Sequence, residues 1–396
     1  MKKITLIPLF LMLFTYVSMQ GQTTAIPDPN FEQALIDLGI DDDPIINGVV
    51  FTSNISVIDK LDVSNKNISD LTGLEDFIAL TSLNCNENMI NSLDVASNVN
   101  LMFLFCNNNQ LSQLDVTSNL NLRWLYCERN ELVSLDISLN TKLDALFCSW
   151  NKLSSLNLSS NLELLQLYCQ WNQLTSLNVN LNTRLHQLWF GGNQLKSIDV
   201  SQNLLLAELD FSGNQIGSLD VGLNPDLELL WCQGNYLKEL DLSSNSFLWQ
   251  FRCEDNQLTY LDLRNGNNTE IWHYNSKNNP ELTCIYVDDA SFSAANWTDI
   301  DANSTFVNNE EECSTLSIED FNSLNSKVYY SSSIKTITIS SPLNITAVRV
   351  YSLSGQELQS FNSNPKTIQV NNLSTGIYII QIDSEKGREV KKIIKH

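Results

Sequence analysis

Histidine is scarce, and short catalytic motifs are absent. The chain has only three histidines, His186, His273 and His396, in separate parts of the sequence. No HExxH, CxxC, nucleophile elbow or phosphate-binding loop occurs in the 396 residues. The sequence therefore predicts no catalytic site, no metal site and no cofactor, and an enzyme is the least favoured class of function.

Basic residues are also few. The chain has 23 Lys and Arg against 45 Asp and Glu, a formal net charge of −22. Residues 21–313 hold 12 basic and 39 acidic residues, whereas residues 314–396 hold nine and six. A surface as acidic as the first part repels phosphate groups, which disfavours nucleic-acid binding. The change of charge near residue 314 indicates a domain boundary.

Long apolar runs are missing apart from one short stretch. Residues 4–17 form an apolar run of 14 residues behind Lys2 and Lys3. This run is too short to span a bilayer, and its basic start is typical of a secretory signal peptide, which we place at 1–21. With no later run of 18 apolar residues, we expect an exported, soluble mature protein without a transmembrane segment.

Asparagine recurs every 21 residues. One series is Asn88, Asn109, Asn130, Asn151, Asn172, Asn193, Asn214, Asn235 and Asn256, and a second begins at Asn98 and runs to Asn245. Between them the pattern reads LxxLxCxxNxLxxLDVSxNxx. About six apolar residues per repeat contribute roughly 9–18 kcal/mol when buried, whereas fixing 21 backbone units costs roughly 20–40 kcal/mol. One repeat cannot fold alone, so we predict a mainly β, parallel β-solenoid of stacked repeats.

The repeat pattern resembles bacterial leucine-rich repeats, in the subclass with two nested half-repeats. The resemblance covers residues 58–279 and implies terminal caps, which we place at 22–57 and 280–313. In the first cap, Asp28 and Pro29 predict the start of a short helix. In the second, Cys284 and Cys313 are the two cysteines outside the repeat pattern, and an exported protein favours a disulfide between them over two free thiols.

The other seven cysteines occupy one position of the repeat. They are Cys85, Cys106, Cys127, Cys148, Cys169, Cys232 and Cys253. A metal site needs thiolates that converge, whereas these form a line. A disulfide ladder needs Cβ atoms about 3.8 Å apart, closer than the strand spacing of about 4.8 Å. The favoured interpretation is that these side chains are small buried hydrophobes.

Residues 316–396 break the pattern and alternate in period two, which predicts a small β-sandwich. The segments 350–355 (VYSLSG), 373–379 (LSTGIYI) and 391–395 (KKIIK) resemble the type A sorting domain of the type IX (Por) secretion system. That resemblance implies recognition by the type IX machinery of a Gram-negative bacterium, with display on the cell surface or release. An ordinary β-sandwich adhesion module is the alternative.

The Asp of the LDV motif forms an outward row. Its members are Asp94, Asp115, Asp136, Asp199, Asp220, Asp241 and Asp262, with Asn157 and Asn178 interrupting the row. Stacked carboxylates suit Ca²⁺ only when several oxygens meet at one ion. Because Asn substitutes freely, hydrogen bonding to the backbone is favoured over a cation site.

A row of aromatic residues lies just before the cysteine position and points outward. It consists of Phe105, Tyr126, Phe147, Tyr168, Trp189 and Trp231, and nearby outward positions add Trp124, Trp150 and Trp171. With half of each of the six rings exposed, the row would offer roughly 450–750 Å² of apolar surface. We predict a protein-binding or adhesion surface, with glycan binding by the same rings as the alternative. A purely structural stack remains open.

Overall fold

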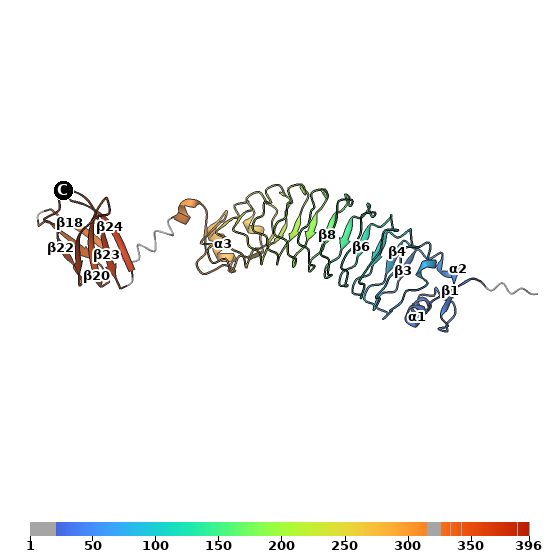
Figure 1. Ribbon diagram of the computed structural model, residues 1–396. Coiled ribbons are helices and arrows are strands. Elements are labelled where there is room, and N and C mark those ends of the chain that lie inside the picture. The colour runs from blue at the N-terminus through green and yellow to red at the C-terminus, as the bar shows by residue number, and fades with distance from the viewer. Residues whose placement is uncertain (1–20, 315–325, 333, 342, 386, 396) are drawn as a thin grey trace, which may run out of the picture. The chain divides into compact units, whose positions relative to one another are not determined.

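The structure is a computed structural model of the chain, and it describes residues 21–314, 326–332, 334–341, 343–385 and 387–395 (Figure 1). The expected signal peptide lies almost wholly outside these residues. The chain divides into two compact units, 1–306 and 307–396, and each is described by itself.

The first unit begins with a small cap. Strand β1 (Thr23–Ala25) pairs antiparallel with β2 (Val49–Phe51), and helices α1 (Pro29–Asp37) and α2 (Thr52–Ile55) lie beside them in the chain. Asp28 caps α1, since its carboxylate accepts the backbone N–H groups of Asn30 and Phe31. The second Asp28 oxygen accepts from the Ser69 N–H at 2.7 Å. The cap is therefore bonded directly to the start of the repeats.

Eleven parallel strands of three residues each form the main sheet of the solenoid. They pair in register with a shift of 21–23 residues between neighbours. In order they are β3 (Lys60–Asp62), β4 (Ser82–Asn84), β5 (Phe103–Phe105), β6 (Trp124–Tyr126), β7 (Ala145–Phe147), β8 (Gln166–Tyr168), β9 (Gln187–Trp189), β10 (Glu208–Asp210), β11 (Leu229–Trp231), β13 (Gln250–Arg252) and β15 (His273–Asn275).

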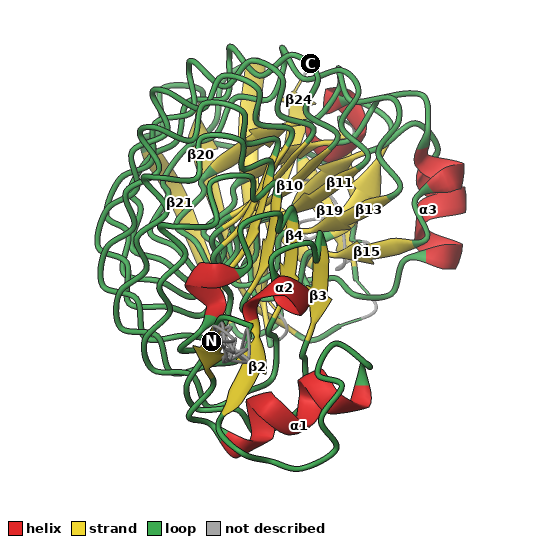
Figure 2. Ribbon diagram, turned by 90° about the vertical axis from the view of Figure 1, so that its right-hand side faces the viewer, coloured by secondary structure: helices red, strands yellow, loops and turns green. Residues whose placement is uncertain are grey.

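The rest of each repeat returns through turns and loops. Figure 2 shows strands of the main sheet gathered on one side of the stack, with loops on the other. Near the end of the stack a second sheet has the order β12 (Glu239–Asp241), β14 (Tyr260–Asp262), β16 (Cys284–Tyr286) and β17 (Thr305–Val307). Helix α3 (Ala290–Asn296) and the short 3₁₀ helices η1 (Leu74–Asp76) and η2 (Asn268–Glu270) complete this unit.

The asparagines of the repeat hold neighbouring turns together. The Asn109 side-chain amide donates to the carbonyls of Cys85 (2.9 Å) and Cys106 (3.2 Å), and its oxygen accepts the N–H of Ile90. In the second series, Asn119 donates to the carbonyls of Val95 and Asn98. These bonds recur at 21-residue intervals along both asparagine series. They satisfy backbone groups that the turns would otherwise leave unpaired in a buried place.

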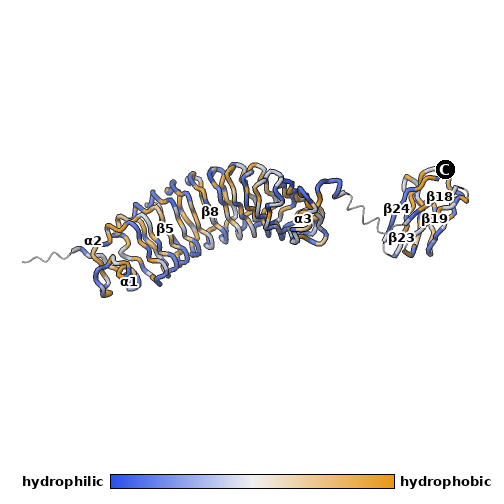
Figure 3. Tube along the Cα trace, turned by 180° about the vertical axis from the view of Figure 1, so that it is seen from behind, coloured by the Kyte–Doolittle hydropathy of each residue, from blue (hydrophilic) through white to orange (hydrophobic). Residues whose placement is uncertain are grey.

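Apolar side chains fill the interior as the pattern predicts. In the repeat that begins at Leu101, the side chains of Leu101, Leu104, Cys106, Leu111 and Val116 are fully buried. Figure 3 shows apolar and polar residues alternating along the chain through the whole stack. One continuous core runs from the N-terminal cap to Phe306, which is the mutual support that a single repeat lacks.

The second unit is a β-sandwich. Three antiparallel strands, β18 (Lys327–Ser331), β19 (Thr336–Ser340) and β22 (Thr367–Gln369), form one sheet. The other sheet is antiparallel and has the order β21 (Glu357–Asn362), β20 (Ile345–Ser352), β23 (Gly376–Ser384) and β24 (Gly387–Lys395). Alternate residues such as Ile337, Val348 and Ile380 meet in one buried cluster, so the period-two pattern is explained by a shared core.

Candidate functional site

The six aromatic residues predicted as a row do form one, here called the aromatic column. Tyr126, Phe147, Tyr168 and Trp189 lie on consecutive strands, with ring centroids 4.1, 4.2 and 4.6 Å apart and planes within 6° of parallel. Phe105 meets Tyr126 edge to face at 5.0 Å. The in-register strands impose this spacing, because each ring projects from the same point of its repeat.

Stacking buries more of these rings than half exposure assumes. All six rings of the aromatic column are mostly buried, and none is among the exposed large side chains of the described residues. The upper estimate of roughly 750 Å² for the exposed apolar area of the column, which assumed half-exposed rings, is therefore wrong. Each ring in the centre of the column is sandwiched between two others, so its faces are covered and only its edge points to solvent.

Asp210 interrupts the aromatic column, and two tryptophans cover it. Trp189 and Trp231 sit on the strands on either side of β10, yet their ring centroids are only 5.8 Å apart. Asp210 is 6% exposed, and this burial raises the pKa of its carboxyl group above its usual value. The carboxylate accepts the Ser212 N–H at 2.9 Å and hydrogen bonds from the Ser212 and Gln170 side chains.

Trp150 and Trp171 form a second, separate stack, here called the tryptophan pair. Their ring centroids are 4.9 Å apart, and the side chains are among the exposed ones, at 45% and 55%. The Arg129 guanidinium lies over the Trp150 ring, 5.0 Å from its centroid. At the other end Trp171 lies over Gly192, where an added Cβ would come within 2.7 Å of the ring.

The backbone of the tryptophan pair is unusual for such large residues. Trp150 and Trp171 have φ values of 58° and 53°, in the left-handed region. The same turn position in the next three repeats is occupied by Gly192, Gly213 and Gly234, also at positive φ. A bulky L-residue costs about 1–2 kcal/mol in this conformation, whereas glycine pays no steric penalty. The backbone therefore does not require tryptophan at these two turns, and in other repeats Glu87, Asn108, Arg129 and Asp255 also occupy the position at positive φ.

A groove of about 340 Å³ lies between the aromatic column and the tryptophan pair. The column contributes Phe147, Tyr168 and Trp189, and the pair forms the opposite wall. The remaining lining residues, which are polar or glycine, are Glu128, Ser149, Gln170, Gly191, Asp210 and Ser212. We call this site the central groove. Its centre carries apolar edges, and its ends carry carboxylates.

The floor of the central groove is a hydrogen-bonded polar row. The Ser149 hydroxyl donates to Gln170 Oε1 at 2.6 Å, and the Gln170 side chain bonds Asp210. Ser149 also bonds the side chain of Glu128, whose pKa is raised because the carboxyl group is partly buried. Burial likewise raises the pKa of Tyr168 to about 12, so the phenol is neutral at physiological pH. The groove is thus preorganised and almost uncharged at its centre.

Trp124 lies at the other side of the aromatic column. Its ring contacts Phe103 at 4.9 Å and stacks on Tyr126 at 6.2 Å, and the side chain is 40% exposed. It lines a second depression of about 450 Å³ together with Phe103, Arg123, Asp144, Ala145, Leu165, Gln166 and His186. The structure thus joins seven of the nine predicted aromatic residues in one contact network and places the other two, Trp150 and Trp171, across the central groove.

The cysteine row belongs to the interior. All seven cysteines in the repeats are buried and carry free thiols. Burial raises the pKa of Cys85 to about 12, and the pKa values of the other six are raised as well. They remain protonated and unreactive at neutral pH. Cys284 and Cys313, by contrast, are both disulfide-bonded.

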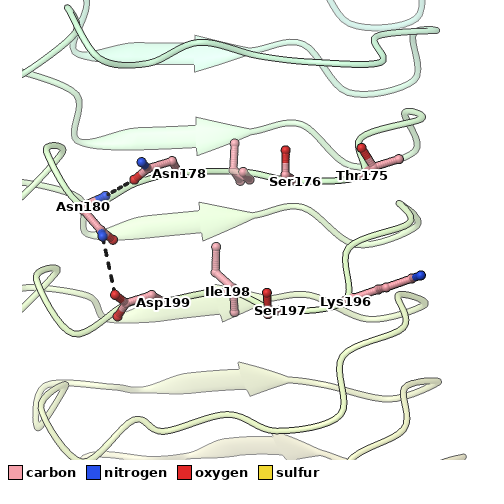
Figure 4. A pocket seen from close by; sticks show the side chains of 9 residues that line it. Thr175, Ser176, Asn178, Asn180, Lys196, Ser197, Ile198 and Asp199 are labelled. Atoms are coloured by element: carbon pink, nitrogen blue, oxygen red, sulfur yellow. Dashed lines mark hydrogen bonds between the residues drawn. The ribbon is translucent and has the colours of Figure 1, made fainter.

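The Asp row supports turns. Asp115, for example, accepts the Thr117 N–H at 2.9 Å, and the same bond from two residues ahead recurs along the row. Figure 4 shows the point where Asn178 takes the place of Asp: Asn178 accepts from the Asn180 N–H, and the Asn180 amide reaches Asp199. Because Asn makes the same bond as Asp, the substitution pattern is explained without a cation.

In the part of the chain that the structure describes, no three His, Cys, Asp or Glu side chains come together as ligands of a metal ion would. Likewise, none of its helices has the length and apolar character needed to cross a bilayer.

The comparisons with known proteins concern both units. Residues 327–396 match the family described as the secretion system C-terminal sorting domain. No curated protein matches the chain. An internalin, InlF, from Listeria monocytogenes has 18% sequence identity and a TM-score of 0.53, and the match covers 74% of this chain and 99% of that one.

Two other solved structures are similar over long stretches. The functional domain of InlJ from Listeria monocytogenes, described as including a cysteine ladder, has 23% identity and a TM-score of 0.42, covering 95% of this chain and 98% of that one. YopM from Yersinia enterocolitica has 26% identity and a TM-score of 0.42, covering 59% of this chain and 49% of that one.

The main unit is thus a leucine-rich-repeat solenoid, a fold typical of protein-interaction modules. The repeat unit has the fold of bacterial leucine-rich-repeat proteins, and residues 327–396 carry a type IX secretion sorting domain. This domain implies secretion or placement on the outer surface of a bacterium. Its match begins at residue 327, later than the boundary of 316 expected from the sequence, and residues 316–325 lie outside the described part.

Sequence reasoning identified the aromatic residues but missed the central groove. The backbone conformation at Trp150 and Trp171 decides how far those rings stand from the sheet. A signal was present in the sequence, because Gly192, Gly213 and Gly234 occupy the corresponding position in the next three repeats. A position that accepts glycine three times in a row indicates a left-handed turn.

Proposed function

We propose that this protein is exported by a Gram-negative bacterium, remains at the cell surface or is released, and there binds another protein without catalysis. The binding site is the central groove together with the exposed edges of the aromatic column. The observation that carries the proposal is the tryptophan pair, two exposed and stacked indoles that form a wall of the central groove, at a turn position where the three following repeats use glycine. The same turn position holds Glu, Asn, Arg, Asp or Gly in other repeats, so the backbone does not dictate two adjacent tryptophans there, which supports a role for them at the surface.

The chemistry of the groove suits a polypeptide partner. Tyrosine and tryptophan are the residues most enriched at the energetic centres of protein interfaces, and such centres are apolar with a polar rim. Phe147, Tyr168, Trp150 and Trp171 supply such a centre, and Glu128 and Asp210 lie at its ends. The excess of acidic residues in 21–313 favours a partner whose contacting surface is basic.

Glycan binding by the same aromatic residues is less well supported. Sugars stack on the faces of aromatic rings, whereas the central rings of the column are covered on both faces at 4.1–4.6 Å. Trp150 has Arg129 on one face and Trp171 on the other, and Trp171 lies over Gly192. Edges remain accessible, and edges suit the aliphatic and carbonyl groups of a protein surface better than the face of a pyranose.

A double substitution tests the proposal. Trp150→Gly with Trp171→Gly introduces the residue that the same turn carries in the next repeats, so the solenoid stays folded while one wall of the groove is removed. Proteins captured from cell surfaces by the wild type would be identified by mass spectrometry, and each affinity then measured with purified partners. We expect the double variant to weaken binding by at least about 30-fold, the loss of one hot-spot residue.

The control is Tyr236→Ser, which removes an aromatic side chain that is 52% exposed and outside the central groove. It should leave affinity unchanged. Equal capture by the wild type and the double variant would contradict the proposed site. A parallel glycan array, on which only the wild type binds, would replace the protein partner with the alternative.

The export part of the proposal has its own test. Deleting residues 327–396 removes the whole sorting domain and leaves the repeat unit intact. We expect the shortened protein to accumulate in the periplasm, measured by cell fractionation and immunoblotting. Its arrival at the cell surface would contradict export through this domain.

A further inference from the structure

A second apolar surface runs along the solenoid, away from the central groove. It lies in the turns that precede the strands, beside the second series of asparagines, whereas the tryptophan pair lies in the turns that follow them. Seven successive turns each expose one large apolar side chain, and Phe247 directly follows an eighth turn; all eight side chains are 50–59% accessible. We call this row the aliphatic edge: Val99, Leu120, Leu139, Leu162, Leu181, Leu204, Leu223 and Phe247.

The aliphatic edge is uncharged. The eight turns are residues 96–99, 117–120, 138–141, 159–162, 180–183, 201–204, 222–225 and 243–246, and they contain no Asp, Glu, Lys or Arg. This is exceptional in a region, residues 21–313, that holds 39 acidic and 12 basic residues. Elsewhere, a second copy would meet like charge, which opposes association. Within these turns it would meet no charged side chain, and the neighbouring carboxylates of the Asp row accept the backbone N–H of the first residue in six of the eight turns.

The size of the aliphatic edge is that of a protein interface. Each turn holds four residues and one of them is the buried asparagine, so three per turn, 24 in all, lie at the surface. A standard interface uses about 20–30 residues from each partner. Half-exposed side chains in a row this long exceed the isolated apolar residues that are normal on a protein surface.

The order of large and small residues is self-complementary. Leu120, Leu162 and Leu204 directly follow the asparagine of their turn, whereas Leu139, Leu181 and Leu223 directly precede it. A second copy can be rotated by 180° about an axis that crosses the middle of the row. This rotation reverses the order of the turns, but a residue that follows its asparagine still faces a residue that follows the asparagine of the partner turn. The second turn then faces the seventh, the third faces the sixth and the fourth faces the fifth. In all three pairings, each leucine faces a residue of the partner turn that is smaller than leucine.

We propose that the aliphatic edge is the interface of an antiparallel dimer of this chain. Its two-fold axis passes between the turns of Leu162 and Leu181. Beside these turns Glu163 and Arg184 form an ion pair within one chain, and the same axis brings Glu163 of one copy opposite Arg184 of the other. Only a chain with the same repeat has the spacing needed to match side chains along the whole row.

Analytical ultracentrifugation of the purified chain tests the proposal. We expect a dimer for the wild type and a dissociation constant raised at least about 100-fold by Leu162→Asn with Leu181→Asn, since four leucine side chains per dimer lose their burial. The control pair, Met89→Asn with Val133→Asn, changes two side chains that are 46% and 55% exposed and lie outside the edge, and it should leave the dimer intact.

Cross-linking tests the orientation. In the antiparallel arrangement residue 118 faces residue 223, so a mixture of Ser118→Cys and Leu223→Cys proteins should give a covalent heterodimer on oxidation, while Ser118→Cys alone should not. The seven native thiols are buried and give little background. A monomer at about 100 μM, or a dimer insensitive to the Leu162 and Leu181 changes, would overturn the interface. Cross-linking of Ser118→Cys alone would overturn the antiparallel orientation.

Discussion

Trp150 and Trp171 occupy the turn position that Gly192, Gly213 and Gly234 occupy in the three repeats that follow. All five residues have positive φ, and the five turns are otherwise alike in their asparagine hydrogen bonds. The backbone accepts glycine at this position without strain, and it tolerates the tryptophans as it tolerates Glu87, Asn108, Arg129 and Asp255 in other repeats. Comparing these two sets of repeats separates residues that hold the solenoid together from residues that the solenoid displays.

The largest expected effect comes from the structural residue of the same turn. Asn151 donates to the carbonyls of Cys127 and Cys148 and accepts from the Leu132 N–H. Asn151→Ala leaves these buried groups unpaired, so we expect a loss of about 3–5 kcal/mol in the free energy of unfolding. Equilibrium urea unfolding measures it. Lys152→Ala, at the exposed next residue, should change stability by less than about 1 kcal/mol, and equal losses would contradict this division.

A smaller effect on the free energy of unfolding is expected at Gly192, the first glycine after the two repeats that carry tryptophan. Gly192→Ala puts a side chain on a left-handed residue and brings its Cβ to 2.7 Å from the Trp171 ring. Gly213→Ala has the same kind of backbone strain, but its nearest atom is 3.6 Å away. We expect both to destabilise by about 1–2 kcal/mol through strain, with Gly192→Ala costing more and also changing the tryptophan fluorescence. Identical behaviour would show that Trp171 does not rest on Gly192.

The pH dependence of Asp210 is expected to be smaller still. Burial raises the pKa of its carboxyl group in the folded state. A raised pKa means that the favourable contribution is present below the unfolded value of about 3.9 and is lost as pH rises through the folded pKa. Asp210→Asn should therefore stabilise the protein at pH 7, with the gain vanishing toward pH 3. Thermal unfolding from pH 3 to 7 measures it, and a gain independent of pH would exclude the carboxyl group as the cause.

Sequence periodicity was enough to place most of the interior. A 21-residue period puts Leu104 and Cys106 on the inside and Phe105 on the outside, because side chains alternate along a strand and in-register strands repeat the alternation. The asparagine bonds and the capping role of Asp28 were predictable for the same reason. Each depends on local chain geometry that the repeat fixes.

Features that depend on how neighbouring turns are shaped were not predictable in this way. Whether the rings of the aromatic column show faces or edges depends on side-chain torsions that the strands only constrain. The wall formed by Trp150 and Trp171 depends on a left-handed turn that large residues rarely adopt. The aliphatic edge was overlooked because Leu162 and Leu181 lie outside the leucine positions of the pattern, on opposite sides of their asparagines.

We infer that the tryptophan pair serves the surface and not the fold. The most direct test is the free energy of unfolding of the Trp150→Gly, Trp171→Gly double variant, measured by urea titration. Relief of about 1–2 kcal/mol of backbone strain per residue offsets the loss of a stack worth about 0.5–1.5 kcal/mol. We therefore expect the double variant to be as stable as the wild type or more stable. A loss of more than about 2 kcal/mol would contradict it and make the tryptophans structural.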